Sequence, residues 1–307
     1  MELISLGDDQ ATGDLAALSA AFLWATATIV YGLLGQKIPP LQLNIYKGLI
    51  SIILIIVTLL LSAKIAAEFD TRVTLILLVS GVIGIGIGDT AYLNALKILG
   101  ARRTLLIESL APPLAAILAL VFLREQLVAI AWCGILLTVL GVAWVIAERT
   151  SNSASNASNF KMGILLALLA ALCQATGAVI SRFALVTSTI DPLWSALWRL
   201  IGGTLILFPL VLKPRRNSED SISVSWSLKL VAAIIFASVS GTYLGIWLQQ
   251  TAFKFSPAGV AQTLLATSPL FVLPLAMVMG EKISLRAILG ALIALLGISL
   301  LFTSHVN

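Results

Sequence analysis

The sequence predicts an all-α integral membrane protein with ten transmembrane helices, arranged as two inverted five-helix repeats. Three observations lead to this fold class: the apolar composition, ten separate runs of membrane-spanning length, and segments that match between the two halves. Of the 307 residues, 59% are hydrophobic and 11% are charged, and the mean hydropathy is +1.05. A soluble domain has about 45–50% apolar and about 25% charged residues. This composition excludes a soluble enzyme, a disordered chain and a nucleic-acid-binding domain.

The apolar runs define the predicted helices. A helix that crosses about 30 Å of hydrocarbon needs roughly 20 mainly apolar residues. No alternating strand pattern occurs, and backbone polar groups in lipid must be satisfied internally, so a helix bundle is expected. The runs lie at 15–34, 41–62, 73–96, 104–123, 127–146, 163–183, 192–212, 229–252, 259–279 and 285–302.

A polar segment at 148–161 divides the chain into a first unit, 1–147, and a second unit, 162–307, with five spans each. Five is an odd number, so the second unit enters the membrane from the opposite side and both termini lie on one side. Inverted repeats are typical of secondary transporters, whose substrate site lies near the midplane between the repeats. The matching pairs are Ala20–Ile29 with Ala170–Val179, Pro40–Lys47 with Pro192–Arg199, Gly84 and Gly88 with Gly241 and Gly245, and Pro113 and Glu125 with Pro269 and Glu281.

These shared motifs resemble a known family. The Pro…Lys/Arg pattern, the Ala95-Leu-Lys97 segment and the Pro…Gly/Arg-Glu hairpin are similar to those of EamA-type members of the drug/metabolite transporter superfamily. The resemblance implies ten helices and transport of small metabolites, often outward, across the bacterial inner membrane. Arg124-Glu125 departs from the usual Gly-Glu, which Gly280-Glu281 retains.

Four ionisable residues lie well inside predicted spans: Lys47, Asp89, Glu108 and Arg199. Intramembrane charges are costly and are therefore functional candidates. From the rise of 1.5 Å per residue, the first three share one level on the order of 10 Å below one surface. We expect Lys47 to pair with Asp89 or Glu108, as a structural bridge or as a proton-coupling group.

Arg199 should lie at a similar depth below the other surface, with only the amides Gln249, Gln250 and Gln262 nearby. Its planar guanidinium then predicts an anchor for a carboxylate or phosphate. The alternative for Arg199, and for Lys47, is that the side chain reaches the nearby membrane surface.

Aromatic and amide residues on neighbouring spans suit a ligand with polar and apolar parts. Glycines at 84, 86 and 88 are interpreted as helix packing residues. A proline inside a helix removes a backbone hydrogen bond and bends the helix, so four prolines are candidate hinges. The predicted substrate residues are Arg199, Trp24, Gln174, Tyr92, Trp198 and Trp247, with Trp198 equally suited to an interfacial belt; the hinges are Pro112, Pro113, Pro269 and Pro274.

The predicted function is a secondary active transporter, and a probable exporter, of small metabolites such as amino acids across the plasma membrane. The sequence lacks an ATP-binding Gly-x4-Gly-Lys-Ser/Thr loop. Cys133, Cys173 and His305 offer no metal or catalytic cluster, so no enzyme, cofactor or metal is expected. The alternatives are a passive facilitator or channel for a small polar solute, and an exchanger of sugar or nucleotide derivatives. The expected partners are a small-molecule substrate, the bilayer and a coupling proton, without nucleic acid.

The orientation stays open at this stage. The net charge of +5 fits basic residues that flank spans. Loops with odd numbers hold more of these residues, which by the positive-inside rule places both termini outside. The family resemblance implies that both termini are inside.

Overall fold

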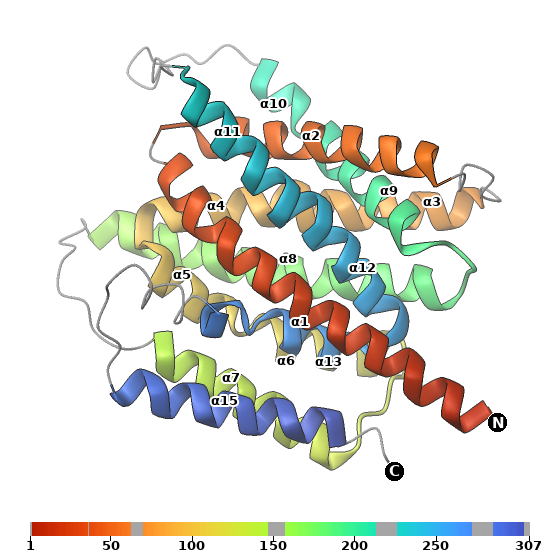
Figure 1. Cartoon of the computed structure of the whole chain (residues 1–307). Coiled ribbons are helices and arrows are strands. Elements are labelled where there is room, and N and C mark those ends of the chain that lie inside the picture. The colour runs from red at the N-terminus through yellow and green to blue at the C-terminus, as the bar shows by residue number, and fades with distance from the viewer. Residues whose placement is uncertain are drawn as a thin grey trace.

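The computed structural model describes residues 2–35, 37–62, 70–146, 157–212, 226–271 and 285–303. Every regular element within these ranges is a helix, so this part of the chain is all-helical. The helices form a bundle in which the start of α1 and the end of α15 lie at the same end (Figure 1). The arrangement as ten spans in two inverted repeats remains a prediction.

Six helical segments of the described residues are long and apolar enough to cross a membrane, so the chain is a multi-pass membrane protein. Three shorter apolar helices accompany them, at Ala111–Phe122, Ala129–Trp144 and Ile288–Phe302. The six longer segments are Asp9–Leu34, Pro40–Leu61, Thr71–Leu99, Phe160–Val186, Pro192–Leu210 and Leu228–Phe255.

Several helices match the predicted runs closely. α1 begins well before its predicted span, at Glu2, and ends at Leu34. α8 begins at Ala157, so the last five residues of the predicted linker 148–161 are helical, while 148–156 lie outside the described residues. The bounds are α1 (Glu2–Leu34), α2 (Pro40–Leu61), α7 (Ala129–Ile146), α8 (Ala157–Val186), α9 (Pro192–Leu205), α10 (Phe208–Leu212) and α15 (Leu285–Thr303).

Two long helices contain a π-helical segment at matching places, which the sequence did not predict. Between residues 71 and 99 the chain forms α3 (Thr71–Gly81), the π-helix η1 (Val82–Gly88) and α4 (Asp89–Leu99). Between 228 and 255 it forms α11 (Leu228–Ala237), η3 (Ser238–Leu244) and α12 (Gly245–Phe255). The Asp89 N–H bonds to the Gly84 carbonyl, and the Gly245 N–H bonds to that of Ser240, five residues back. Such π-helical turns are frequent at functional sites.

Three further predicted spans are broken: 104–123, 259–279 and 192–212, the last by a turn at 206–207 between α9 and α10. The first consists of α5 (Ala101–Glu108) and α6 (Ala111–Phe122), joined by a turn at 109–110. The second begins with α13 (Ala258–Leu265), turns at 266–267 and is helical again at 268–271.

The predicted hinge prolines follow these breaks. Pro112 and Pro113 occupy the first turn of α6, where a missing N–H costs no helical hydrogen bond. Pro269 follows the second break in the same way. These prolines therefore begin a new helix after a break instead of bending a continuous one. Pro274 lies outside the described residues.

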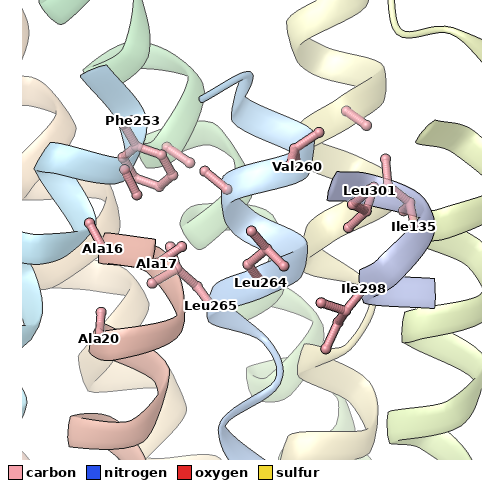
Figure 2. Close-up of a cluster of buried hydrophobic side chains, with 14 of the residues drawn as sticks. Ala16, Ala17, Ala20, Ile135, Phe253, Val260, Leu264, Leu265, Ile298 and Leu301 are labelled. Atoms are coloured by element: carbon pink, nitrogen blue, oxygen red, sulfur yellow. The ribbon is translucent and has the colours of Figure 1, made fainter. Parts of the chain in front are cut away.

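Small residues let the helices approach closely. Ala16, Ala17 and Ala20 of α1 are buried in one cluster with Phe253 of α12 and Leu264 of α13 (Figure 2). The cluster continues to α7 and α15, which pack along each other at one edge of the bundle (Figure 1). In a membrane, where lipid tails are as apolar as leucine, such close packing drives helix association.

The closest backbone approach joins α3 to α9 and fixes the position of Arg199. A Cβ added at Gly81 would lie 1.9 Å from the Arg199 carbonyl oxygen. One added at Gly202 would lie 2.3 Å from the Leu78 carbonyl oxygen. Both glycines are therefore required where they are, because any side chain would push the two helices apart.

We predict that Gly81→Ala lowers the free energy of unfolding by about 1–3 kcal/mol, the usual cost of overpacking. The displaced α9 should also reduce transport. Gly32→Ala is the matched control, since a Cβ at Gly32 meets nothing within 4 Å. Thermal unfolding in detergent compares the two variants. Equal melting temperatures would contradict the close contact between α3 and α9.

Candidate functional site

The interrupted helices surround one internal cavity of about 170 Å³. The π-helical segments contribute Ile85 and Gly241 to its lining, and the break after α5 contributes Glu108. Ala266 and Pro269 line it from the second break. Four of the departures from regular helix therefore lie at the cavity, as in transporters that bind substrate at discontinuous helices, while the turn at 206–207 does not line it.

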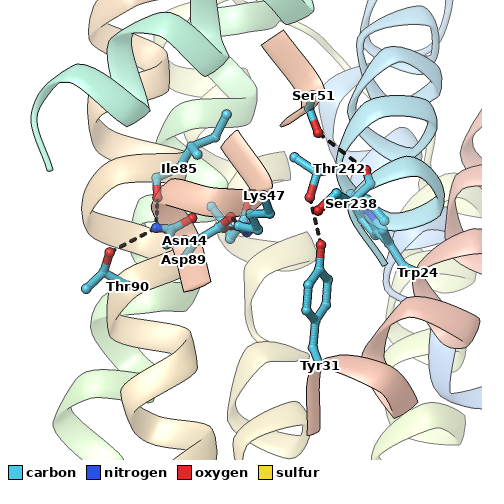
Figure 3. A network of polar contacts seen from close by, with 12 residues as sticks. Trp24, Tyr31, Asn44, Lys47, Ser51, Ile85, Asp89, Thr90, Ser238 and Thr242 are labelled. Carbon is cyan, nitrogen blue, oxygen red and sulfur yellow. Dashed lines mark hydrogen bonds and ion pairs between the residues drawn. The ribbon is translucent and has the colours of Figure 1, made fainter. Parts of the chain in front are cut away.

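Side chains from neighbouring helices satisfy backbone carbonyls in the π-helical segments. Asn44 donates from Nδ2 to the Ile85 carbonyl and to Thr90 Oγ1, both at 3.0 Å (Figure 3). Trp24 donates from Nε1 to the Gly241 carbonyl at 2.7 Å. Each irregular segment is therefore held by a polar side chain of another helix, as a low-dielectric interior requires.

Tyr31 reinforces the second π-helical segment. Its hydroxyl lies 2.8 Å from the Ala237 carbonyl, to which it donates, and 2.9 Å from Thr242 Oγ1. Ser51 of α2 donates to the Ser238 carbonyl at 3.3 Å. These contacts join α1 and α2 to the long helix 228–255 (Figure 3).

The predicted pairing of Lys47 is present: its ammonium group forms an ion pair with Asp89 (Figure 3). The two side chains are 10% and 17% exposed. Gln174 donates from Nε2 to the other Asp89 oxygen, at 3.4 Å. The Lys47 ammonium also lies 5.8 Å from the centre of the Tyr31 ring, a cation–π contact. Lys47 therefore points into the protein and not to the membrane surface.

Glu108 is the second carboxylate of the cavity. It ends α5, directly before the helix break. Its Oε1 atom is buried and has no hydrogen-bond partner within the described part of the chain. Asp89 lies close enough to interact with it electrostatically. The two acids are therefore in different situations: Asp89 is paired, and one oxygen of Glu108 is not.

Arg199 is 1% exposed and also lines the cavity, so it does not reach the surface. It donates from Nη1 to Gln249 Oε1 at 3.1 Å, while its Nε has no partner among the described residues. Gln262 presents a similarly unpartnered Oε1. Gly84 makes room for the guanidinium, since a Cβ there would lie 3.0 Å from Nη2.

Arg199 shares its cavity with a second cationic residue, Lys47. Depth counting placed it away from Lys47, with only amides nearby, yet both side chains line the same cavity. Asp89 also interacts electrostatically with Arg199. The long arginine side chain extends from its own level toward the middle of the bundle, which a count of backbone rise does not capture.

The predicted substrate residues divide into two groups. Trp24, Tyr92 and Gln174 line the cavity with Arg199, whereas Trp198 and Trp247 do not. Successive helical residues point about 100° apart. Trp198 lies one residue before Arg199 and therefore points away from the cavity. Trp247 lies two residues before the lining residue Gln249 and also points away from it.

These two tryptophans pack against other aromatic rings. Trp198 stacks on Trp194 with ring centres 6.2 Å apart, beside the buried Val73. Trp247 lies 6.3 Å from Tyr243. Both rings therefore take part in aromatic contacts outside the cavity lining.

Tyr31 and Thr242 are lining residues that the sequence reasoning missed. The signal for Tyr31 was available, because it lies seven residues after Trp24, two turns along the same helix face. Thr242 lies inside η3, and no periodic pattern reveals a π-helical segment.

The comparisons with known proteins agree with this architecture. The model of the EamA-like transporter family matches residues 11–147 and 161–303. A protein of Archaeoglobus fulgidus described as an uncharacterized transporter is 26% identical over 291 residues, which cover 94% of this chain and 96% of that protein. A solved crystal structure has the same fold, with a TM-score of 0.76 at 18% identity, over 94% of this chain and 96% of the other.

The family model covers most of the chain, and its description fits the apolar helices around a polar cavity. A transporter family implies a small-molecule substrate and a membrane environment. The chain belongs to the EamA-like transporter family and is a membrane transporter, not an enzyme.

Proposed function

We propose that the protein is a secondary transporter that moves a small metabolite with an anionic group by alternating access, without ATP. The observation that carries the proposal is Arg199 on the wall of a cavity at interrupted helices. Its guanidinium is buried, its Nη1 donates to Gln249, and its Nε has no partner in the described part of the chain. A buried charge is favourable only when it is paired. A carboxylate or phosphate suits the forked guanidinium geometrically.

The proposed architecture is ten spans in two inverted repeats, 1–147 and 162–307, joined by the segment 148–161. Two findings support it. The family model matches the chain twice, on either side of that segment. The π-helical segments and the helix breaks also recur at matching positions, with Gly84 and Gly88 in the first half and Gly241 and Gly245 in the second.

For the substrate we propose a metabolite such as an amino acid, with its carboxylate at Arg199. Gln249 and Gln262 lie on α12 and α13 and offer further polar atoms to the anionic group. Trp24 and Tyr92 provide apolar surface for the rest of the molecule. Outward transport across the plasma membrane, with both termini on one side, rests on the family resemblance.

Uptake and efflux in proteoliposomes test this function. A thermal-shift screen of amino acids, sugars, nucleosides and phosphate esters first identifies compounds that bind, because a ligand stabilises the folded state. Radiolabelled candidates are then followed in both directions, with and without an imposed proton gradient. Saturable flux supports a carrier, and flux that never saturates would instead indicate a passive pore.

Arg199 variants test the anchor. Arg199→Lys keeps the charge but loses the bidentate geometry of the guanidinium, so it should weaken transport of an anionic substrate roughly tenfold. Arg199→Gln loses both and should weaken it further. Trp198→Phe is the matched control, since it neighbours Arg199 on α9 and points away from the cavity. Wild-type apparent affinity in both Arg199 variants would remove this residue from the substrate site.

Proton coupling is proposed at the carboxylates of the cavity, and Glu108 is the better candidate of the two. Asp89 is engaged with Lys47 and Gln174, whereas Glu108 has an unpartnered oxygen. Glu108→Gln should abolish the dependence of transport on an imposed proton gradient while substrate exchange continues.

Asp89→Asn has a different expected result. It leaves Lys47 buried without an anion, which should lower the free energy of unfolding by about 3 kcal/mol. Lys47→Met combined with Asp89→Asn should recover part of this loss. Unchanged gradient dependence in both Glu108→Gln and Asp89→Asn would place the coupling elsewhere.

A further inference from the structure

Glu125 and Arg182 form an ion pair outside the substrate cavity. Glu125 lies in the hairpin between α6 and α7, and Arg182 lies near the end of α8. Arg182 Nε donates to Glu125 Oε1 at 2.7 Å, and the side chains are 14% and 17% exposed. The first belongs to the segment 11–147 and the second to 161–303, so the pair joins the two segments that match the family model.

The same two side chains hold the ends of two further helices. Glu125 Oε2 accepts from the Ala258 N–H at the start of α13, at 2.9 Å. Arg182 Nη1 donates to the Phe253 and Lys254 carbonyls at the end of α12, at 2.9 and 2.7 Å. A carboxylate at a helix start and a cation at a helix end both complement the helix dipole. We call these five residues the latch.

Two further hydrogen bonds join neighbouring segments beside the latch. Ser256 donates to Asp14 Oδ1 at 2.6 Å, which ties the chain after α12 to α1. Lys254 donates to the Ile190 carbonyl at 2.7 Å. By contrast, the cavity residues of α1 lie further along that helix, from Trp24 to Tyr31, toward the opposite end. The latch therefore lies at the end of the bundle where α1 begins (Figure 1).

The backbone before Glu125 supports a specific role. Arg124 has a φ of 56°, in the left-handed region that favours glycine. Arg124 adopts this left-handed conformation although arginine disfavours it. Glu125, the next residue, is thereby placed where it binds Arg182 and the Ala258 N–H.

The latch has no equivalent arginine in the other half. With the offset of 150 that relates Ala20–Ile29 to Ala170–Val179, the position that matches Arg182 is Gly32. A Cβ at Gly32 would meet nothing within 4 Å. Within the described part of the chain, Gly32 therefore provides no cationic side chain at the position that matches Arg182.

We propose that Glu125 and Arg182 form a one-sided gate, which keeps the cavity closed at the end where α1 begins and must separate before the cavity opens there. This inference rests on the proposed alternating access. Separating a partly buried pair that also holds two helix ends is costly, because both charges lose their partners. The conformation with this end closed is therefore the resting state.

Accessibility of one cysteine tests the gate. The background is Cys133→Ala with Cys173→Ala, and Ala266→Cys places the probe in the cavity lining. A membrane-impermeant maleimide is added from each side in turn, using vesicles of both orientations. With the latch intact, labelling should occur from the side opposite the latch. Glu125→Gln and Arg182→Gln should each raise labelling from the latch side roughly tenfold, a one-decade shift in the opening equilibrium.

Two further variants sharpen the test. Arg182→Lys retains the charge and loses the fork that holds the α12 carbonyls, so it should give an intermediate rise. Asp70→Asn is the matched control, because it removes an exposed carboxylate that caps α3 and has no part in the latch. It lies at the same end, since Val73 of α3 packs with Ala184 of α8.

The proposal is overturned if folded Glu125→Gln and Arg182→Gln proteins label from the latch side no faster than the background protein. It is equally overturned if the background already labels at the same rate from both sides. Absence of saturable flux for every metabolite would instead contradict the proposed function. The labelling does not depend on a known substrate, so the two failures are distinguishable.

Discussion

The structure depends on one constraint: inside a membrane, every backbone N–H and C=O group must find its partner within the protein. The described chain departs from regular helix at two π-helical segments within the long spans, and at turns within three further spans, at 109–110, 206–207 and 266–267. All of these departures except the turn at 206–207 lie at the cavity, where Asn44 and Trp24 satisfy carbonyls of the π-helical segments. Irregular backbone is tolerated there because neighbouring side chains and the cavity compensate for it, and this determines where the cavity lies.

The same constraint governs the charges. Lys47 and Asp89 satisfy each other, so they need no ligand to be stable in the interior. Arg199 and Glu108 each retain a buried atom without a partner in the described chain. Lys47 and Arg199 occupy matching sequence positions, but Lys47 is paired with Asp89 whereas Arg199 donates to the neutral Gln249. The one-sided latch at Glu125 extends this asymmetry to the end of the bundle.

Much of the fold followed from the sequence, because helix length and apolar content report directly on span position. The Lys47 pairing followed as well, since depth along a helix is a simple count. The helix breaks could not be predicted from the sequence. Pro112 gives the same sequence signal whether it bends one helix or begins a new one. Trp198 and Trp247 were expected at the substrate site but do not line the cavity, because a shift of one or two residues along a helix turns a side chain away from it. The π-helical segments, and Thr242 with them, carry no periodic signature.

Hydrogen–deuterium exchange of the protein in nanodiscs, followed by mass spectrometry, tests most directly whether the interrupted helices form the substrate site. Peptides that cover 82–88, 109–110, 238–244 and 266–267 should exchange faster than α2 and α7, because the cavity brings water to them. Saturation with a transported metabolite should slow exchange in all four segments together. Exchange as slow as in the uninterrupted helices, with no effect of the metabolite on these segments, would contradict the account.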